Sequence, residues 1–231
     1  MRQLASDARS SPSLRPGLMT PTEHAVLIDQ LVASAHDAGA EKLNLSTSGN
    51  FSLRLDDNTI AITAARTRLG KLSAVEVLVL PLKGSSPDFG DRVPSRETPM
   101  HVAMYRSHPK VRCFLHFQSL AATTLGCRDA PLPDLNFIPE LPVYVRRVGN
   151  VPYLPPGSDA LAEGVAKAFN DPDVRVAHLR NHGQVVIGDS PAQAVERATF
   201  FELACRIYLL SEHSGGSRSY SSEDLALLMS Y

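Results

Sequence analysis

The chain has 231 residues, of which 43% are hydrophobic, and its 23 Lys and Arg residues nearly balance 24 Asp and Glu residues. This composition excludes a largely disordered chain, and the charge balance argues against nucleic-acid or anionic-membrane binding, because phosphate contacts need a local excess of Lys and Arg. No apolar run approaches the roughly 20 residues that span a bilayer, and three dispersed cysteines offer no disulfide framework, so we expect a cytoplasmic globular protein.

The N-terminal half of the chain predicts a helix followed by strands. Residues 1–20 are rich in Ser, Arg and Pro and indicate a flexible extension, whereas residues 21–231 are expected to form one domain. Residues 21–39 repeat apolar side chains at helical spacing. The segments that follow are two strands joined by a polar turn (53–63, LRLDDNTIAIT), a third strand (75–82, VEVLVLPL) and a loop (84–95).

The C-terminal half predicts a further alternation of helices and strands. In chain order we expect a helix (98–109), a strand (111–120), a Pro-rich loop (131–142), a helix (160–169) capped by Ser158, two strands (174–179 and 184–189) around a turn, a long helix (192–212) and a last helix (221–231). Strands with helices on both sides favour a three-layer αβα sandwich of the α/β class.

Two histidines interrupt otherwise apolar elements. His116 lies within a predicted strand, and Gln118, two residues further on, points to the same face. His182 lies in a turn between two strands. Two imidazoles on separate rigid elements suit a divalent metal ion, although a buried histidine is often a hydrogen-bonded core residue. His101 and His178 stay undecided between a functional role and a core role.

Polar residues at two loop ends are further candidates. Glu97 lies where a helix is about to start, either as a general base or metal ligand or as a carboxylate favoured by the helix dipole. Gly49 and Asn50 either present backbone N–H groups to an anion or form an ordinary turn. The sequence has no Gly-rich phosphate-binding motif, so no nucleotide cofactor is expected.

Together and in this order, these segments resemble the class II aldolase/adducin family. The resemblance covers about residues 23–212 and rests on SGNFSLRL, AITAARTRLGKL, VPSRETPMHVAMYRSHPKV, FLHFQS, YLPPGS and RNHGQVVIGDSPAQAVERATFFELACRIYLL. It implies an αβα sandwich around a largely antiparallel or mixed sheet. It also implies a homo-oligomer, often a tetramer, and a divalent metal ion, usually zinc, that is held by three histidines.

Carried over position by position, the resemblance implies metal ligation by His116 and His182 and acid–base chemistry by Glu97. The segments that it associates with the anionic end of a substrate contain Gly49, Asn50, Thr63, Arg66, Ser95 and Arg96. Gln118 replaces the second histidine of the family's His-x-His pair. Because an amide oxygen is a weaker ligand than imidazole, we expect looser zinc binding, with Mn²⁺, Co²⁺ or Fe²⁺ as alternatives.

Two arginines also depart from the family pattern. Arg96 replaces the second serine of a Ser-Ser-Glu segment, and Arg66 ends a Thr-Ala-Ala-Arg sequence where the family has Thr-Pro-Ser-Gly. These guanidinium groups suit a substrate carboxylate or phosphate, since arginine binds both through paired hydrogen bonds. Alternatively, Arg96 pairs with Asp88 or Asp91 and Arg66 faces solvent.

The resulting hypothesis is a metal-dependent carbon–carbon lyase, an aldolase or a decarboxylase, acting through an enolate on a small anionic carbonyl compound, hydroxy acid or sugar derivative. Glu97 would move the proton. Epimerases and dehydratases of this fold use the same chemistry. The alternative is an adducin-like binding or scaffold protein without metal, which Gln118 favours and the retained Glu97 and His182 oppose. In either case, neither nucleic acid nor membrane is an expected partner.

Overall fold

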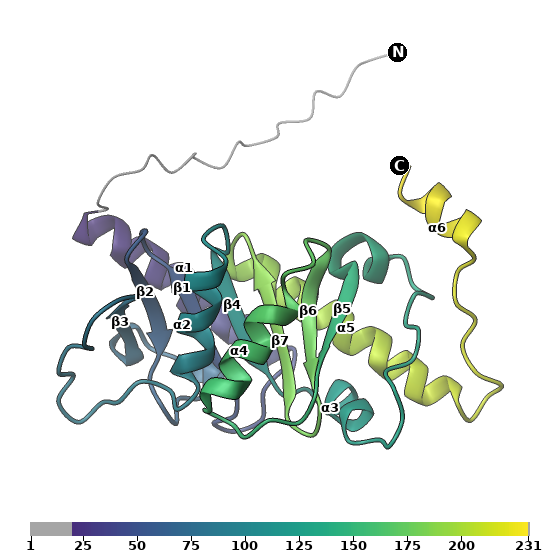
Figure 1. The fold of residues 1–231 in the computed structure, drawn as a ribbon, viewed down its shortest axis with the longest axis horizontal. Coiled ribbons are helices and arrows are strands. Elements are labelled where there is room, and N and C mark those ends of the chain that lie inside the picture. The colour runs from purple at the N-terminus through teal and green to yellow at the C-terminus, as the bar shows by residue number, and fades with distance from the viewer. Residues whose placement is uncertain (1–19, 231) are drawn as a thin grey trace, which may run out of the picture.

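The computed structural model describes residues 20–230, and these form helices and strands in alternation (Figure 1). The elements are α1 (Pro21–Ala40), β1 (Asn50–Arg54), β2 (Thr59–Thr63), β3 (Val77–Pro81), α2 (Thr98–Ser107), β4 (Cys113–Phe117), α3 (Leu120–Gly126), β5 (Arg147–Val151), α4 (Asp159–Ala168), β6 (Val174–Leu179), β7 (Gly183–Gly188), α5 (Pro191–Ser211) and α6 (Ser222–Leu228). Apart from Thr20, the predicted extension at residues 1–20 lies outside the described residues.

The strands form one sheet in the order β3-β2-β1-β4-β7-β6-β5. Every neighbouring pair is antiparallel except β5 and β6, which are parallel. Helices cover both faces of this sheet (Figure 1). The expected three-layer sandwich around a mixed, largely antiparallel sheet is therefore confirmed.

The two faces of the sheet carry separate cores. Cys113, Leu115 and Phe117 on β4 pack into the core that α1, α3 and α5 complete. Phe114 points to the opposite face, where it joins the core beneath α2 and α4. Because side chains alternate along a strand, His116 shares the face of Phe114. The candidate site therefore lies on the side of the sheet that α2 and α4 cover.

Local sequence signals account for several boundaries. The predicted hairpin is confirmed, and the Oδ1 atom of Asp56 accepts hydrogen bonds from the backbone N–H groups of Asn58 and Thr59, both at 2.8 Å. Ser158 caps α4 as expected, because its hydroxyl oxygen accepts from Leu161 N at 3.1 Å. Such caps satisfy backbone donors that the first helical turn leaves free.

Two elements differ from the sequence prediction. The strand expected over residues 111–120 ends at Phe117, and α3 follows it. The carboxylate of Glu202, on α5, accepts hydrogen bonds from the backbone N–H groups of Ala121 and Ala122 and so caps α3. That cap comes from a distant segment, which is why the local pattern did not reveal the helix. β5 is a partly exposed edge strand that the sequence pattern did not predict.

The last helix, α6, lies apart from the sandwich (Figure 1), and none of its residues is buried. The helix predicted near the C-terminus is thus confirmed. None of the helices between residues 20 and 230 combines the length and apolar character needed to cross a membrane.

Candidate active site

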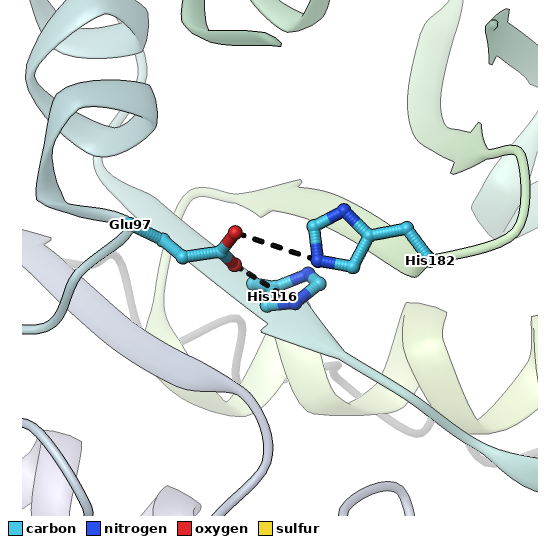
Figure 2. Close-up of side chains that lie close together, drawn as sticks. All are labelled: Glu97, His116 and His182. Carbon is cyan, nitrogen blue, oxygen red and sulfur yellow. Dashed lines mark ion pairs between the residues drawn. The ribbon is translucent and has the colours of Figure 1, made fainter. Parts of the chain in front are cut away.

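Three side chains from three separate elements converge on one point (Figure 2). Glu97 immediately precedes α2, His116 lies near the end of β4, and His182 lies in the turn between β6 and β7. One ligand atom from each residue lies within 4.8 Å of the others. The structure thus brings together the predicted acid–base residue and the two predicted histidine ligands.

The turn before α2 directs Glu97 into this site. The hydroxyl oxygen of Ser95 accepts from Glu97 N at 3.3 Å, and Thr98 N donates to Ser95 O at 3.0 Å. The Glu97 side chain is consequently buried, with only 8% of the residue exposed. Ser95, which was predicted to contact an anion, uses its hydroxyl group to shape this turn.

The hydrogen bonds of His116 determine which ring nitrogen faces the centre. Its Nδ1 atom donates to the backbone oxygen of Gln184 at 2.9 Å, so the Nε2 atom carries the lone pair. That lone pair faces Oε2 of Glu97 at 3.0 Å. Two acceptor atoms at this distance repel each other unless a proton or a cation lies between them. The backbone bond at Nδ1 is the usual support of a metal-binding histidine.

His182 completes the site from a tight turn. Its Nε2 atom lies 3.4 Å from Oε1 of Glu97, and its ring meets that of His116 edge-on with centroids 4.9 Å apart. A Cβ at Gly183 would lie 2.7 Å from Phe117 O, which explains the glycine at this position. The turn can therefore approach β4 closely only because Gly183 lacks a side chain.

Gln118 contacts the same turn. Its amide nitrogen donates to the backbone oxygen of His182 at 3.1 Å. The amide nitrogen is thereby committed to the turn, and the amide oxygen is the atom of Gln118 left for the predicted metal ligation. Gln118 thus connects β4 to the segment that carries His182.

Burial controls the charges in the site. Burial raises the pKa of Glu97, and this outweighs the lowering by the charge of His182 and by a hydrogen bond from Asn50. Burial lowers the pKa of His116 to about 4. The pKa of His182 is lowered by burial and by His116. At neutral pH both imidazoles are therefore uncharged, which is the form that binds metal ions.

The donor set fits a divalent cation. Oε1 of Glu97 and Nδ1 of His182 are buried and have no hydrogen-bond partner within residues 20–230. Two neutral imidazoles and one carboxylate are a ligand set that protein zinc sites use. A cation would also remove the repulsion between Glu97 and His116. The residues present therefore suit the metal that the sequence resemblance implied.

Gly49 and Asn50, both predicted to contact an anion, lie at the start of β1, where Asn50 pairs with His116 on β4. Gly49 has φ +78°, and a Cβ there would lie 1.8 Å from Nδ2 of Asn44 and 2.6 Å from His116 O. Asn50 is 5% exposed, and its Oδ1 atom bonds to Nε2 of His101. The Asn50 side chain is thus directed into the protein, toward α2.

The remaining predicted anion-binding positions differ in exposure. Thr63 is buried, and its hydroxyl oxygen accepts from Phe51 N at 3.2 Å. Arg66 and Arg96 are exposed. Their segments lie side by side, because Ala65 N donates to Val93 O at 2.9 Å. The two guanidinium groups consequently come from adjacent segments near the centre.

The alternative interpretation of Arg96 was an ion pair with Asp88 or Asp91. No such pair occurs within residues 20–230. The backbone of Gly157 instead lies over Arg96, since a Cβ at Gly157 would be 3.1 Å from Cγ of Arg96. The same glycine donates its N–H to Glu97 and thereby contributes to lowering the pKa of that carboxyl. The loop before α4 thus covers one side of the site.

The two undecided histidines have different surroundings. Nε2 of His178 donates to Ala122 O at 3.0 Å, and the ring packs edge-on against Phe201, so His178 belongs to the core. His101 contacts Asn50 and is therefore connected to the site. Its position four residues after Glu97, which places it on the same helix face, is the signal in the sequence that connects it to the site.

Comparisons with known proteins agree with this geometry. The model of the Class II Aldolase and Adducin N-terminal domain matches residues 29–209. A protein of Haemophilus influenzae named 3-oxo-tetronate 4-phosphate decarboxylase is 33% identical over 199 residues, which are 82% of this chain and 89% of the relative. The L-fuculose phosphate aldolase of Methanococcus maripaludis is 31% identical over 171 residues, or 74% of this chain and 89% of the relative.

Solved structures share the fold. The crystal structure of YgbL from Klebsiella pneumoniae superimposes with a TM-score of 0.78 and 28% identity, covering 89% of this chain and 98% of that one. An L-fuculose 1-phosphate aldolase superimposes with a TM-score of 0.77 and 24% identity, covering 89% and 95% of the two chains. The arrangement of the sheet and its helical layers is therefore shared along nearly the whole length of these proteins.

Proposed function

The chain belongs to the class II aldolase and adducin family, and we propose that it is a metal-dependent carbon–carbon lyase for a small phosphorylated or carboxylated carbonyl compound. The observation that carries the proposal is the convergence of Glu97, His116 and His182 (Figure 2). The relatives named above are a decarboxylase and an aldolase, and both kinds of enzyme are lyases. We also propose a homotetramer, from the family resemblance, and a cytoplasmic location, from the composition of the chain.

His116, His182 and the amide oxygen of Gln118 would hold the divalent cation, and Glu97 would join them only when no substrate is bound, because a carboxylate that binds a cation has no proton to give. When bound, such a cation acts as a Lewis acid that polarises a substrate carbonyl group. Nitrogen and carboxylate donors suit Zn²⁺, and they also accept Mn²⁺, Co²⁺ or Fe²⁺. Zinc is the ion that we propose.

The proton steps fall to Glu97, whose pKa is raised by burial. In decarboxylation of a 3-oxo acid, the C1–C2 bond breaks, its electron pair enters an enolate, carbon dioxide leaves, and C2 takes a proton from Glu97. In retro-aldol cleavage, the carboxylate removes the hydroxyl proton as the carbon–carbon bond breaks. It then returns that proton to the enolate carbon after the aldehyde has formed.

Decarboxylation is the reaction that the comparisons favour. The relative named 3-oxo-tetronate 4-phosphate decarboxylase is more similar to this chain, at 33% identity over 82% of it, than the fuculose phosphate aldolase, at 31% over 74%. We therefore propose a phosphorylated 3-oxo acid as substrate, with aldol cleavage of a sugar phosphate as the second candidate. The exposed Arg66 and Arg96 would bind the phosphate or carboxylate group.

Metal analysis followed by product analysis tests the proposal. Purified protein is expected to contain near-stoichiometric metal by mass spectrometry, and His116→Ala and His182→Ala should both lose it. His178→Ala is the matched control, because that buried histidine lies outside the site. The protein is then incubated with 3-oxo-tetronate 4-phosphate and with L-fuculose 1-phosphate, and release of carbon dioxide or aldehyde is measured.

The outcomes separate the proposed enzyme from its competitor. Release of carbon dioxide supports the decarboxylase, and release of aldehyde supports the aldolase. Protein that binds no metal after incubation with Zn²⁺, Mn²⁺ and Co²⁺ would contradict the proposal. That result would favour the adducin-like binding protein instead.

A further inference from the structure

A chain of polar side chains runs from the candidate centre into the space between α2 and β1. On α2, His101 and Tyr105 follow Glu97 at intervals of four residues, so these side chains share one helix face. On β1, Asn50 and Ser52 are two residues apart and therefore share one strand face. All five residues are buried. Two rows of buried polar side chains thus face each other.

His101 connects these rows through both of its ring nitrogens. Its Nε2 atom bonds to Oδ1 of Asn50, and its Nδ1 atom lies 2.6 Å from the hydroxyl oxygen of Ser52. The same Ser52 oxygen lies 2.9 Å from the hydroxyl group of Tyr105. The bonded sequence is therefore Asn50, His101, Ser52 and Tyr105, and Asn50 lies directly opposite His116 in the pairing of β1 with β4.

The direction of each hydrogen bond follows from the Asn50 side chain. Nε2 of His101 bonds to Oδ1 of Asn50, and a carboxamide oxygen only accepts, so the proton of His101 is on Nε2. The NH₂ group of Asn50 is left to donate elsewhere, which agrees with its contribution to lowering the pKa of Glu97. Nδ1 of His101 accepts from the hydroxyl of Ser52, whose oxygen accepts from Tyr105.

The protonation states agree with this direction. Burial and the nearby His116 hold the pKa of His101 well below its ordinary range, while burial holds the pKa of Tyr105 well above its own. Both groups are therefore neutral at physiological pH. Neutral groups provide one proton for each bond of the chain, so no bond in it has two donors or two acceptors.

We infer that His101 is a positioning residue of the candidate active site, which orients the carboxamide of Asn50 so that its NH₂ group holds Glu97 toward His116 and His182. The N–H group of His101 bonds the amide oxygen of Asn50. Without this donor, the amide would be free to rotate and present its oxygen to the Glu97 carboxylate. Asn50 thereby acquires a role in the centre itself, in addition to the anion contact predicted for its turn. The inference rests on the proposed metal centre.

Metal affinity is the first measurement, because it requires no substrate. Competition against a chromophoric chelator should show a roughly ten- to hundred-fold weaker affinity for Zn²⁺ in His101→Leu, as is typical when support of a metal ligand is removed. His101→Gln should recover much of that loss, since its amide can donate to Asn50 and accept from Ser52. His178→Leu, the matched buried histidine, should stay within about twofold of the wild type.

A double-mutant cycle tests whether His101 acts through Asn50. Asn50→Ala should weaken Zn²⁺ binding, and adding His101→Leu to it should cost little more, because residues acting as a unit are not additive. Tyr105→Phe removes only the far hydroxyl group and serves as a milder variant where His101→Leu fails to fold. It should weaken Zn²⁺ binding by a few-fold. Full additivity in the cycle, or wild-type affinity in folded His101→Leu, would overturn the inference.

Failure of the inference differs from failure of the proposed function. Wild-type protein that binds no metal contradicts the metal centre. Wild-type protein that binds Zn²⁺ with an affinity that does not depend on His101 contradicts only the inference. The tautomer of His101 also tests the inference in metal-free protein. Nitrogen-15 NMR should find its proton on Nε2, and a proton on Nδ1 would overturn the inference whatever the metal content.

Discussion

Nε2 of His116 lies 3.0 Å from Oε2 of Glu97, while Nδ1 of the same ring is committed to the backbone oxygen of Gln184. The facing atoms are both acceptors, and both residues are buried. Without a cation between them these atoms repel when the carboxyl is ionised, which agrees with the raised pKa of Glu97. A metal ion would remove that repulsion. The site is therefore arranged for binding at the expense of stability, as functional sites commonly are.

Glu97→Gln should stabilise the metal-free protein while abolishing metal binding. Burial raises the pKa of Glu97, so the carboxyl favours folding below its ordinary pKa of about 4.5 and loses that contribution as the pH rises through the folded value. Gln removes the buried charge and can donate to Nε2 of His116. We expect the melting temperature at pH 7.5 with chelator to rise by a few degrees, where about 2–4 °C corresponds to 1 kcal/mol.

The control for this substitution is Glu163→Gln on the exposed side of α4, which should change stability little. The gain from Glu97→Gln should also shrink at pH 5, where the wild-type carboxyl is more fully protonated. If Glu97→Gln melts at a lower temperature than the wild type at pH 7.5 with chelator, the buried Glu97 carboxylate does not destabilise the protein.

Gly49→Ala should be strongly destabilising. Gly49 has φ +78°, and a Cβ would meet Nδ2 of Asn44 at 1.8 Å and His116 O at 2.6 Å. Left-handed strain of about 1–2 kcal/mol then adds to overpacking of about 1–3 kcal/mol. Gly84→Ala is the matched control, because Gly84 has φ +88° but open space around it. Urea unfolding should show a clearly larger loss for Gly49→Ala, and equal losses would refute the close approach.

Gln118→Leu should loosen the turn that carries His182. The substitution removes the hydrogen bond from the amide nitrogen to His182 O and the amide oxygen together. We expect Zn²⁺ affinity to fall about tenfold, which is less than the loss in His182→Ala. Gln193→Leu is the control, since Gln193 bonds a backbone N–H at the opposite end of β7. Unchanged affinity in Gln118→Leu would remove Gln118 from the site.

Arg96→Ala should weaken binding of the anionic substrate. Its guanidinium group is exposed beside the centre and has no carboxylate partner among Asp88 and Asp91. For the phosphorylated substrate we expect KM to rise about tenfold or more, with kcat within a few-fold of the wild type. Lys167→Ala, at an exposed position of α4, should leave both constants unchanged. An unchanged KM in Arg96→Ala would refute the anion contact.

Much of the fold could be predicted because its signals are local. The hairpin turn at Asp56 and the cap at Ser158 are formed by side chains that bond backbone groups two or three residues away. By contrast, α3 depends on Glu202, which is about 80 residues distant in sequence. No short window of sequence contains that contact, so the helix was not predicted, and the strand before it was extended to Leu120.

The candidate site divides in the same way. The residues with the right chemistry can be identified in the amino-acid sequence, because Glu97, His116 and His182 interrupt apolar elements and match a family pattern. The folded structure adds how their atoms face one another, that Gln118 bonds the His182 turn, and that His101 bonds Asn50. Side-chain direction and hydrogen-bond pairing depend on the packing of α2 and the β6–β7 turn against the sheet, and that packing exists only once distant segments have come together.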